Sequence, residues 1–254
     1  MKSDSPTRQL LKEVLWAVSL TVVCAWVMYL VFKSVNYHWH WDTVWKWRWL
    51  ILKGWGLTMF ISACALFLSV PLALLLMAGQ RSGWIPVRQF SRACVEIVRG
   101  SPLLVLLLLG YYGVANALGV TTPTPAGVVI LALFHASYLS EIFRGAWESI
   151  GASQLEAARA VGFSRGQTWR FVIFPQALRR ALPGTAGQMV SLIKDSSLLT
   201  IIGVEELTQM VRAANAQAYT ALEAYIPLAV LYLILTLPLS WWTRRLEERF
   251  KYET

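Results

Sequence analysis

The sequence is poor in charged residues for its length. Asp, Glu, Lys and Arg make up 15% of its 254 residues, against roughly 25% in an average soluble domain. Histidine is also scarce, and the three cysteines, Cys24, Cys64 and Cys94, lie far apart without metal-ligand spacing. The few, widely spaced cysteines exclude a disulfide scaffold. The low charge excludes a disordered chain, because disorder requires high charge. It also argues against a soluble enzyme.

Apolar residues make up 56% of the chain, and the mean hydropathy is +0.50. About 20 apolar residues suffice for a helix to cross a bilayer. Six stretches meet or approach this requirement: Val14–Phe32, Gly54–Ala78, Pro102–Leu118, Ala126–Phe143, Thr185–Val204 and Leu222–Trp242. No clear small-x-small cleavage site follows the first stretch, so we interpret it as a retained anchor. The pattern predicts an all-α, polytopic membrane protein with six transmembrane helices.

The basic residues are distributed unevenly about these six stretches. With the N-terminus in the cytoplasm, 17 of the 23 Lys and Arg residues fall on the cytoplasmic side. Because cytoplasmic loops carry the excess of Lys and Arg, both termini are predicted to be cytoplasmic. The net charge of +9 therefore indicates orientation in a membrane and does not indicate nucleic-acid binding.

Three parts of the chain follow from this topology. Residues 1–53 form an N-terminal tail, the first span and a Trp-rich outer loop. Residues 54–243 form the core membrane domain with a cytoplasmic loop at about 144–184, and residues 244–254 form a cytoplasmic tail.

The cytoplasmic loop predicts a helix, a turn and a second helix. Ser153 and Glu156 fit a capping box at the start of the first helix. Gly162 is placed to end this helix, because glycine adopts the left-handed backbone at low cost. Ser164 is placed to cap the second helix, which Pro175 limits.

The spacing within this loop resembles the EAA loop of binding-protein-dependent ABC importer permeases. The family pattern is Glu-Ala-Ala, three residues, Gly, nine residues and Ile-x-Leu-Pro. This sequence matches without gaps, with two conservative changes, Val172 for Ile and Phe174 for Leu; the matching residues are Glu156, Ala157, Ala158, Gly162, Val172 and Pro175. Three further stretches resemble polar amino-acid permeases: Glu96–Leu104, Glu141–Gly145 and Lys194–Leu198. The first 50 residues match no family signature.

The resemblance implies a type I ABC importer permease fold and uptake of a polar amino acid or an opine by alternating access. It implies three protein partners: a second permease subunit, identical or paralogous; an ATPase subunit dimer that the loop contacts; and a soluble substrate-binding protein. The chain itself is expected to hold no catalytic residue, metal or cofactor, with ATP and Mg²⁺ bound by the ATPase. The sequence agrees on one point, because it contains no Gly-x-x-x-x-Gly-Lys-Ser/Thr phosphate loop.

Several polar residues within or near the spans are candidates for the translocation path or a gate. They are Lys194, Asp195, Ser196 and Ser197 in the fifth span, and Glu141 and Arg144 near the end of the fourth. Charges within a membrane are costly and often functional. The alternative is structural pairing with another helix, or, for Glu141 and Arg144, an ordinary pair at i, i+3. For His135 we expect a hydrogen-bonded buried histidine.

The outer loop is rich in tryptophan. Trp41, Trp45 and Trp49 recur at i, i+4 and would share one helix face. An aromatic anchor at the membrane interface is the favoured interpretation, with contact to the binding protein as the alternative. His38 and His40 offer only two metal ligands.

Two other function classes remain as alternatives. An ion-gradient-driven secondary transporter is expected to show inverted repeats and discontinuous helices, and we find no such repeat. An intramembrane enzyme needs a nucleophile, an acid/base pair or a metal cluster. The sequence contains neither Gly-x-Ser-x-Gly nor His-Glu-x-x-His.

Overall fold

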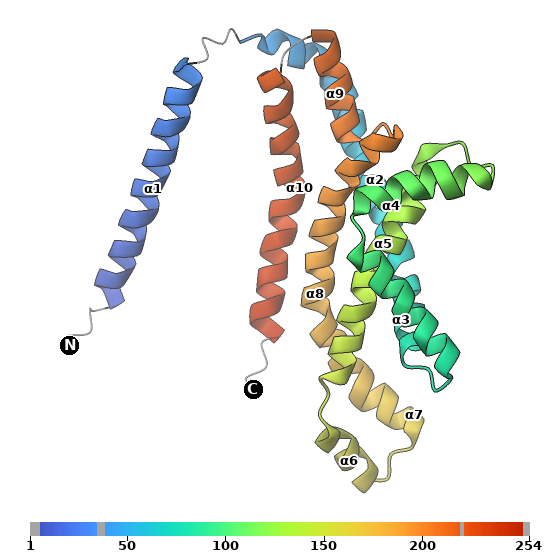
Figure 1. Ribbon diagram of the computed structural model, residues 1–254. Coiled ribbons are helices and arrows are strands. Elements are labelled where there is room, and N and C mark those ends of the chain that lie inside the picture. The colour runs from blue at the N-terminus through green and yellow to red at the C-terminus, as the bar shows by residue number, and fades with distance from the viewer. Residues whose placement is uncertain (1–5, 35–38, 219–220, 251–254) are drawn as a thin grey trace. The chain divides into compact units, whose positions relative to one another are not determined.

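The computed structural model of the chain describes residues 6–34, 39–218 and 221–250 (Figure 1). Within these ranges the chain is helical and forms no strand. It divides into two compact units, Met1–Trp41 and Asp42–Thr254. The first unit holds α1 (Pro6–Ser34). His38 and the start of the Trp-rich segment lie outside the described residues.

The second unit contains the remaining helices. In chain order they are α2 (Trp41–Gln80), α3 (Ile85–Gly100), α4 (Leu103–Leu108), the π-helix η1 (Leu109–Ala115), α5 (Pro123–Glu148), α6 (Ala152–Ala160), α7 (Arg165–Thr168), the π-helix η2 (Trp169–Ile173), α8 (Phe174–Asp195), the 3-10 helix η3 (Ser196–Ile202), α9 (Leu207–Ala218) and α10 (Ala221–Phe250).

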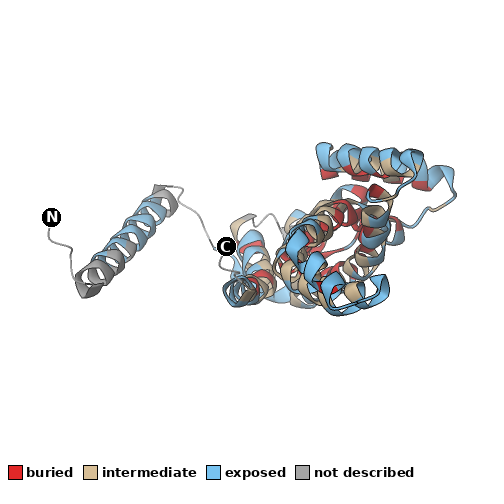
Figure 2. Ribbon diagram, turned by 90° about the horizontal axis from the view of Figure 1, so that it is seen from below, coloured by how far each residue is buried: buried red, intermediate tan, exposed pale blue. Residues whose placement is uncertain are grey.

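Helix α5 is packed on several sides within this unit. It contacts α3, α4 and α8, and Leu131 and Leu139 on it are fully buried. Leu131 belongs to an apolar cluster with Ile61 of α2, Leu107 of α4 and Leu199 of η3. Figure 2 shows the buried residues between the helices and the exposed ones on the outer faces. Apolar burial therefore holds α5 among its neighbours.

A sharp break separates α3 from α4. The chain bends by 109° between α3 and the segment Leu103–Ala115, which holds α4 and η1. Ser101, at the bend, has an extended backbone with ψ of 140°. Proline disfavours a helical backbone at the residue before it, so Pro102 ends α3. Pro102 is the N-cap of α4, with the first helical position at Leu103, one residue later than we predicted.

Among the residues that the structure describes, three helices are long and apolar enough to cross a membrane: Val44–Gln80, Pro123–Glu148 and Leu222–Phe250. The bent pair of α3 with α4 and η1 makes a fourth candidate, and α1 contributes a shorter apolar stretch, Val18–Leu30. The predicted fifth span, Thr185–Val204, comprises the end of α8 and the 3-10 helix η3, which follows α8 directly. The count of six spans thus stays a prediction.

The Trp-rich segment forms the start of α2. Trp41, Trp45 and Trp49 are exposed, whereas Trp47 packs against the apolar cluster around Leu207. The guanidinium of Arg48 lies 4.5 Å from the ring centroid of Trp45. The predicted shared face of the three tryptophans is confirmed, and its role as an anchor stays a prediction.

A buried hydrogen bond between α2 and the start of α9 provides a test of this packing. Thr58 is fully buried, and its Oγ1 accepts from the backbone N–H of Leu207 at 3.0 Å. Thr58→Val keeps the shape but removes the acceptor, so we expect the free energy of unfolding to fall by about 1–3 kcal/mol. The measurement is the apparent Tm of the purified protein in detergent. Thr58→Ser retains the oxygen and is the control; equal Tm values for the two variants would contradict the assignment.

Candidate functional site

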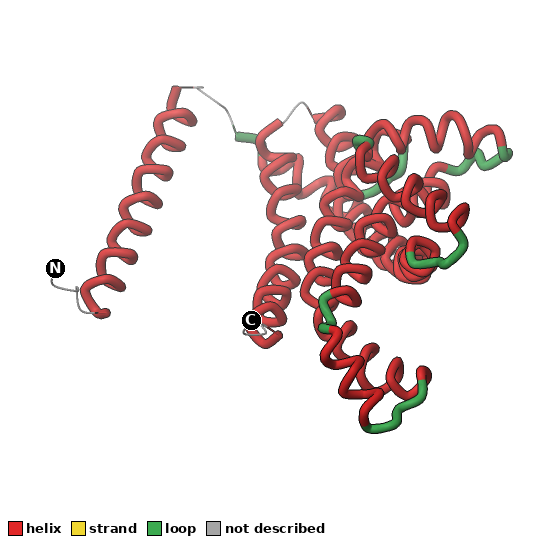
Figure 3. The backbone as a smooth tube through the Cα atoms, turned by 60° about the horizontal axis from the view of Figure 1, so that its bottom comes forward, coloured by secondary structure: helices red, strands yellow, loops and turns green. Residues whose placement is uncertain are grey.

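The loop predicted to be cytoplasmic forms α6, α7 and η2, which project beyond the ends of α5 and α8 (Figure 3). The predicted capping box at Ser153 and Glu156 is wrong, because α6 begins at Ala152 and its N-cap, Gly151, makes no side-chain cap bond. Ser153 therefore lies inside the first turn, too late in the chain to cap it. A capping box does form at the next helix, where Ser164 and Gln167 bond reciprocally. The predicted cap at Ser164 is confirmed.

Gly162 ends α6 as predicted. Its φ is +78°, in the left-handed region that glycine adopts without strain. Its N–H donates to the carbonyl of Arg159, and the N–H of Phe163 donates to that of Ala158. These two bonds are the Schellman pattern, which satisfies carbonyls left unpaired at a helix end. Gly162 thereby directs the chain from α6 into the turn before α7.

The motif residues present a mixed surface. Glu156 and Ala157 are exposed, Ala158 is buried, and Val172 and Pro175 are half-buried. Large apolar side chains around them are also exposed: Val161, Phe163, Trp169, Phe171 and Phe174. Exposed apolar groups gathered on a polar loop are typical of a protein interface. The loop therefore offers α6 and its surroundings to a partner.

A series of ion pairs, the charge ladder, connects the end of α5 to α3 and to the residue after α2. Arg144 donates to Glu141 at 2.7 Å and to Glu148 at 2.6 Å along α5. Arg99 of α3 lies 3.5 Å from Glu141, and Arg81, which directly follows α2, lies 3.8 Å from Glu148. The predicted i, i+3 pair of Glu141 with Arg144 is confirmed. The carboxylates of Glu141 and Glu148 also face Arg99 and Arg81 of neighbouring segments.

A polar recess of about 300 Å³ opens beside this ladder. It is lined by Gln80, Arg92, Val95, Glu96, Arg99, Glu141 and Arg144. Charged groups of both signs there suit a hydrated or zwitterionic occupant better than an apolar one.

The second polar group lies deeper, between α5 and α8. His135 of α5 is fully buried, and its Nδ1 lies 2.7 Å from the amide nitrogen of Gln188. Because an amide nitrogen only donates, Nδ1 accepts and the proton of the neutral ring lies on Nε2. Nε2 lies 3.4 Å from Asp195 Oδ2 but makes no hydrogen bond. The expectation of a hydrogen-bonded histidine thus holds for one ring nitrogen only.

The structure brings Asp195 to His135, whereas the adjacent Lys194 is exposed. The Asp195 side chain is 34% exposed, so its carboxylate borders both the buried imidazole and open space. Ser196 and Ser197 donate to the carbonyls of Ile193 and Lys194, respectively. Their hydroxyl protons are therefore already engaged within their own helical turn.

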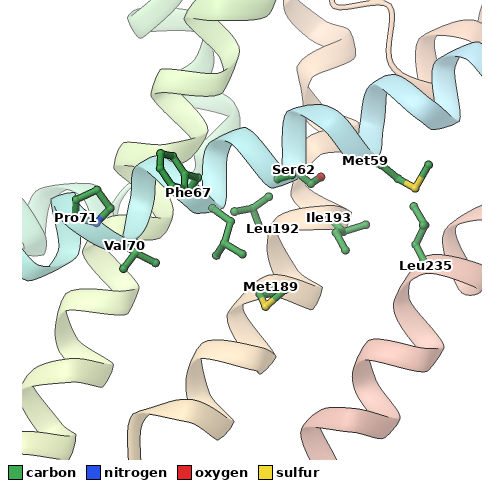
Figure 4. A pocket seen from close by; sticks show the side chains of 11 residues that line it. Met59, Ser62, Phe67, Val70, Pro71, Met189, Leu192, Ile193 and Leu235 are labelled. Carbon is green, nitrogen blue, oxygen red and sulfur yellow. The ribbon is translucent and has the colours of Figure 1, made fainter. Parts of the chain in front are cut away.

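An apolar pocket of about 760 Å³ lies between α2, α8 and α10 (Figure 4). Met59, Phe67 and Leu235 are among its lining side chains, and Ser62 contributes a buried hydroxyl without a hydrogen-bond partner. A charged solute in this pocket would lose its hydration water, and the almost wholly apolar walls would offer it few hydrogen bonds in return. This pocket is thus unsuited to a polar solute, unlike the surroundings of Asp195.

Two buried carboxylates, Glu206 and Glu223, have no local signal in the sequence. Glu206 accepts from the backbone N–H groups of Thr208 and Gln209 and from the hydroxyl of Tyr232. Burial raises the pKa of Glu206 above its usual range. Glutamate is not among the residues favoured at an N-cap, so no local signal marked this role. Within the described ranges, no three His, Cys, Asp or Glu side chains gather as metal ligands do.

Comparison with known proteins matches residues 69–252 to the family described as binding-protein-dependent transport system inner membrane component. The glutamine transport system permease protein of Escherichia coli is 38% identical over 205 residues, covering 80% of this chain and 93% of that protein. The nopaline transport system permease protein of Agrobacterium fabrum is 35% identical, covering 68% of this chain and 78% of that protein.

Solved structures agree with this match. A crystal structure of an amino acid ABC transporter with histidines superposes with a TM-score of 0.78 at 29% identity, covering 84% of this chain and all of that one. The MetNI methionine ABC transporter shares the fold. It superposes with a TM-score of 0.65 at 23% identity, covering 80% of this chain and 97% of that one. The chain therefore has an ABC importer permease fold and belongs to the family of binding-protein-dependent transport system inner membrane components.

Proposed function

We propose that this chain is the membrane-spanning permease subunit of an ATP-driven importer that takes up a polar amino acid or an opine. The observation that carries the proposal is the exposed cytoplasmic hairpin, in which Glu156-Ala157-Ala158 and Gly162 stand at the family spacing on α6 and its Schellman turn. The named relatives transport glutamine and nopaline, which are polar solutes with carboxylate and amine or amide groups.

Energy for transport comes, in this proposal, from a separate subunit. An ATPase dimer binds ATP and Mg²⁺ and receives α6, because this chain has no phosphate loop of its own. A second permease subunit pairs with this one, and a soluble binding protein delivers the amino acid at the outer face. The chain resides in the inner membrane with both termini in the cytoplasm, as the distribution of Lys and Arg favours.

The translocation path, in this proposal, passes the polar group between α5 and α8. The half-exposed Asp195 carboxylate offers a site for the substrate's ammonium, and the exposed Lys194 offers one for its carboxylate, with Ser196 and Ser197 beside them. Glu141 and Arg144 act as a cytoplasmic gate, because they border the polar recess at the end of α5. ATP binding then favours one of two access states through its differential affinity.

The assembly with its ATPase tests the function directly. We expect the chain to co-purify with an ATPase subunit and, in liposomes with the binding protein, to take up amino acid only when ATP is supplied on the ATPase side. An imposed proton or sodium gradient without ATP is the control. Uptake driven by the gradient alone would identify a secondary transporter and contradict the proposal.

Gly162 provides a test of the coupling loop. A Cβ at this position meets open space, so a substitution acts through the backbone, where a left-handed conformation costs roughly 1–2 kcal/mol. We expect Gly162→Val to abolish ATP-driven uptake while membrane insertion, measured by fractionation, is unchanged. Gly162→Asn tolerates this backbone and should retain uptake. Normal ATPase coupling in Gly162→Val would refute the role.

Asp195 provides a test of the path. Asp195→Asn removes the charge but keeps the shape, so we expect uptake at low substrate concentration to fall about tenfold, equivalent to about 1.4 kcal/mol. ATPase assembly should be unaffected. Glu205→Gln, at an exposed carboxylate after η3, is the matched control. Equal uptake by the two variants would exclude Asp195 from the path.

A further inference from the structure

Arg180 of α8 joins the two ends of the cytoplasmic loop. Its Nη1 donates to the backbone carbonyl of Ser149 and, at 2.7 Å, to the hydroxyl oxygen of the same residue. Ser149 directly follows α5, and 31 positions separate it from Arg180. All of α6, α7 and η2 lie between these two residues. The contact therefore closes the base of the loop.

The chemistry of this contact suits a fixed joint. Ser149 is the C-cap of α5, and carbonyls at a helix end lack intrahelical partners. The negative end of the helix dipole favours a cation there, and a guanidinium makes charge-assisted bonds that are stronger than neutral ones. The Ser149 hydroxyl in turn donates to the carbonyl of Ala146 at 2.8 Å. Arg180 thus bonds to the carbonyl of Ser149 directly and, through the Ser149 hydroxyl, is linked to Ala146 in the last turn of α5.

The joint lies next to the charge ladder. Glu148 precedes Ser149 and pairs with Arg144 and Arg81, and Glu141, two turns earlier on α5, pairs with Arg99 of α3. A displacement of α6 reaches the membrane helices through the ends of α5 and α8. With these ends joined, α5 and α8 move together and pass the displacement to α3. Without the joint, the loop bends at its base and the displacement dissipates.

We propose that Arg180 is a positioning residue for energy coupling, which holds the loop base rigid so that movement of α6 on the ATPase becomes movement of α5 and α8. This inference rests on the proposed function. It assigns to Arg180 no contact with substrate, ATP or the ATPase. Loss of Arg180 should therefore change how efficiently ATP hydrolysis is used, and should leave ATPase binding in place.

The experiment measures amino-acid molecules imported per ATP hydrolysed, in liposomes containing the full complex with its ATPase and binding protein. The probe is whichever solute the wild-type complex imports fastest among the twenty amino acids and nopaline, the opine named for one relative. We expect Arg180→Ala to lower this ratio about fivefold or more, as for loss of bonds to a charged group. Arg180→Lys, which keeps one cationic donor, should retain at least half of the wild-type ratio.

Arg179→Ala is the matched control, because Arg179 is the adjacent exposed residue of the same charge. We expect it to leave the ratio unchanged. A wild-type ratio in Arg180→Ala, or an equal loss in Arg179→Ala, would overturn the inference. If Arg180→Ala does not assemble, Arg180→Met carries the test, because it keeps a long side chain without a donor, and a wild-type ratio there overturns the inference. Absence of ATP-driven uptake in the wild-type complex refutes the proposed function instead.

Discussion

The bilayer core lacks water, and this single constraint determines how the chain folds. Each backbone N–H and C=O group within the core has to bond inside the protein, so the chain forms helices and its charged groups gather at helix ends. Two departures from regular α-helix adjoin charged residues: the break at Ser101 and Pro102 lies beside Arg99, and the 3-10 helix η3 follows Asp195. The candidate site residues Asp195, Glu141 and Arg144 accordingly lie near points where helices change or end.

In the proposed importer, this arrangement lets a partner that binds ATP move this chain. Force then enters at α6, where polar backbone and exposed aromatic groups are accessible. It leaves through α5, which apolar packing around Leu131 holds among its neighbours. Since packed helices move as rigid bodies with few alternative arrangements, a displacement at one end shifts the whole element. In the proposed importer, the ion pair of Arg99 with Glu141 extends this movement to α3.

Much of the fold was predictable from the sequence, because its signals are local. Apolar runs predicted α2, α5 and α10, and the requirement for a positive φ predicted the helix end at Gly162. Contacts between distant residues were not predictable: Arg99 with Glu141, His135 with Gln188, and Glu206 with Tyr232 depend on tertiary packing.

Two local features were not predicted correctly from the sequence: the start of α6 and the change from α8 to a 3-10 helix. The capping box at Ser153 was misplaced because α6 begins at Ala152, with Gly151 as its N-cap. The change from α8 to η3 between Asp195 and Ser196 has no glycine or proline beside it, so no local signal marked it.

In the proposed function, energy coupling requires that α6 bind to an ATPase subunit. A spin label on a cysteine at position 157, with the three native cysteines replaced by serine, reports on this contact. In the isolated chain Ala157 is exposed, so the spectrum of a label there should be mobile. We expect immobilisation of this label on assembly with the ATPase, and no change for a label at exposed Glu205. Equal mobility of the label at position 157 with and without the ATPase would show that α6 does not dock.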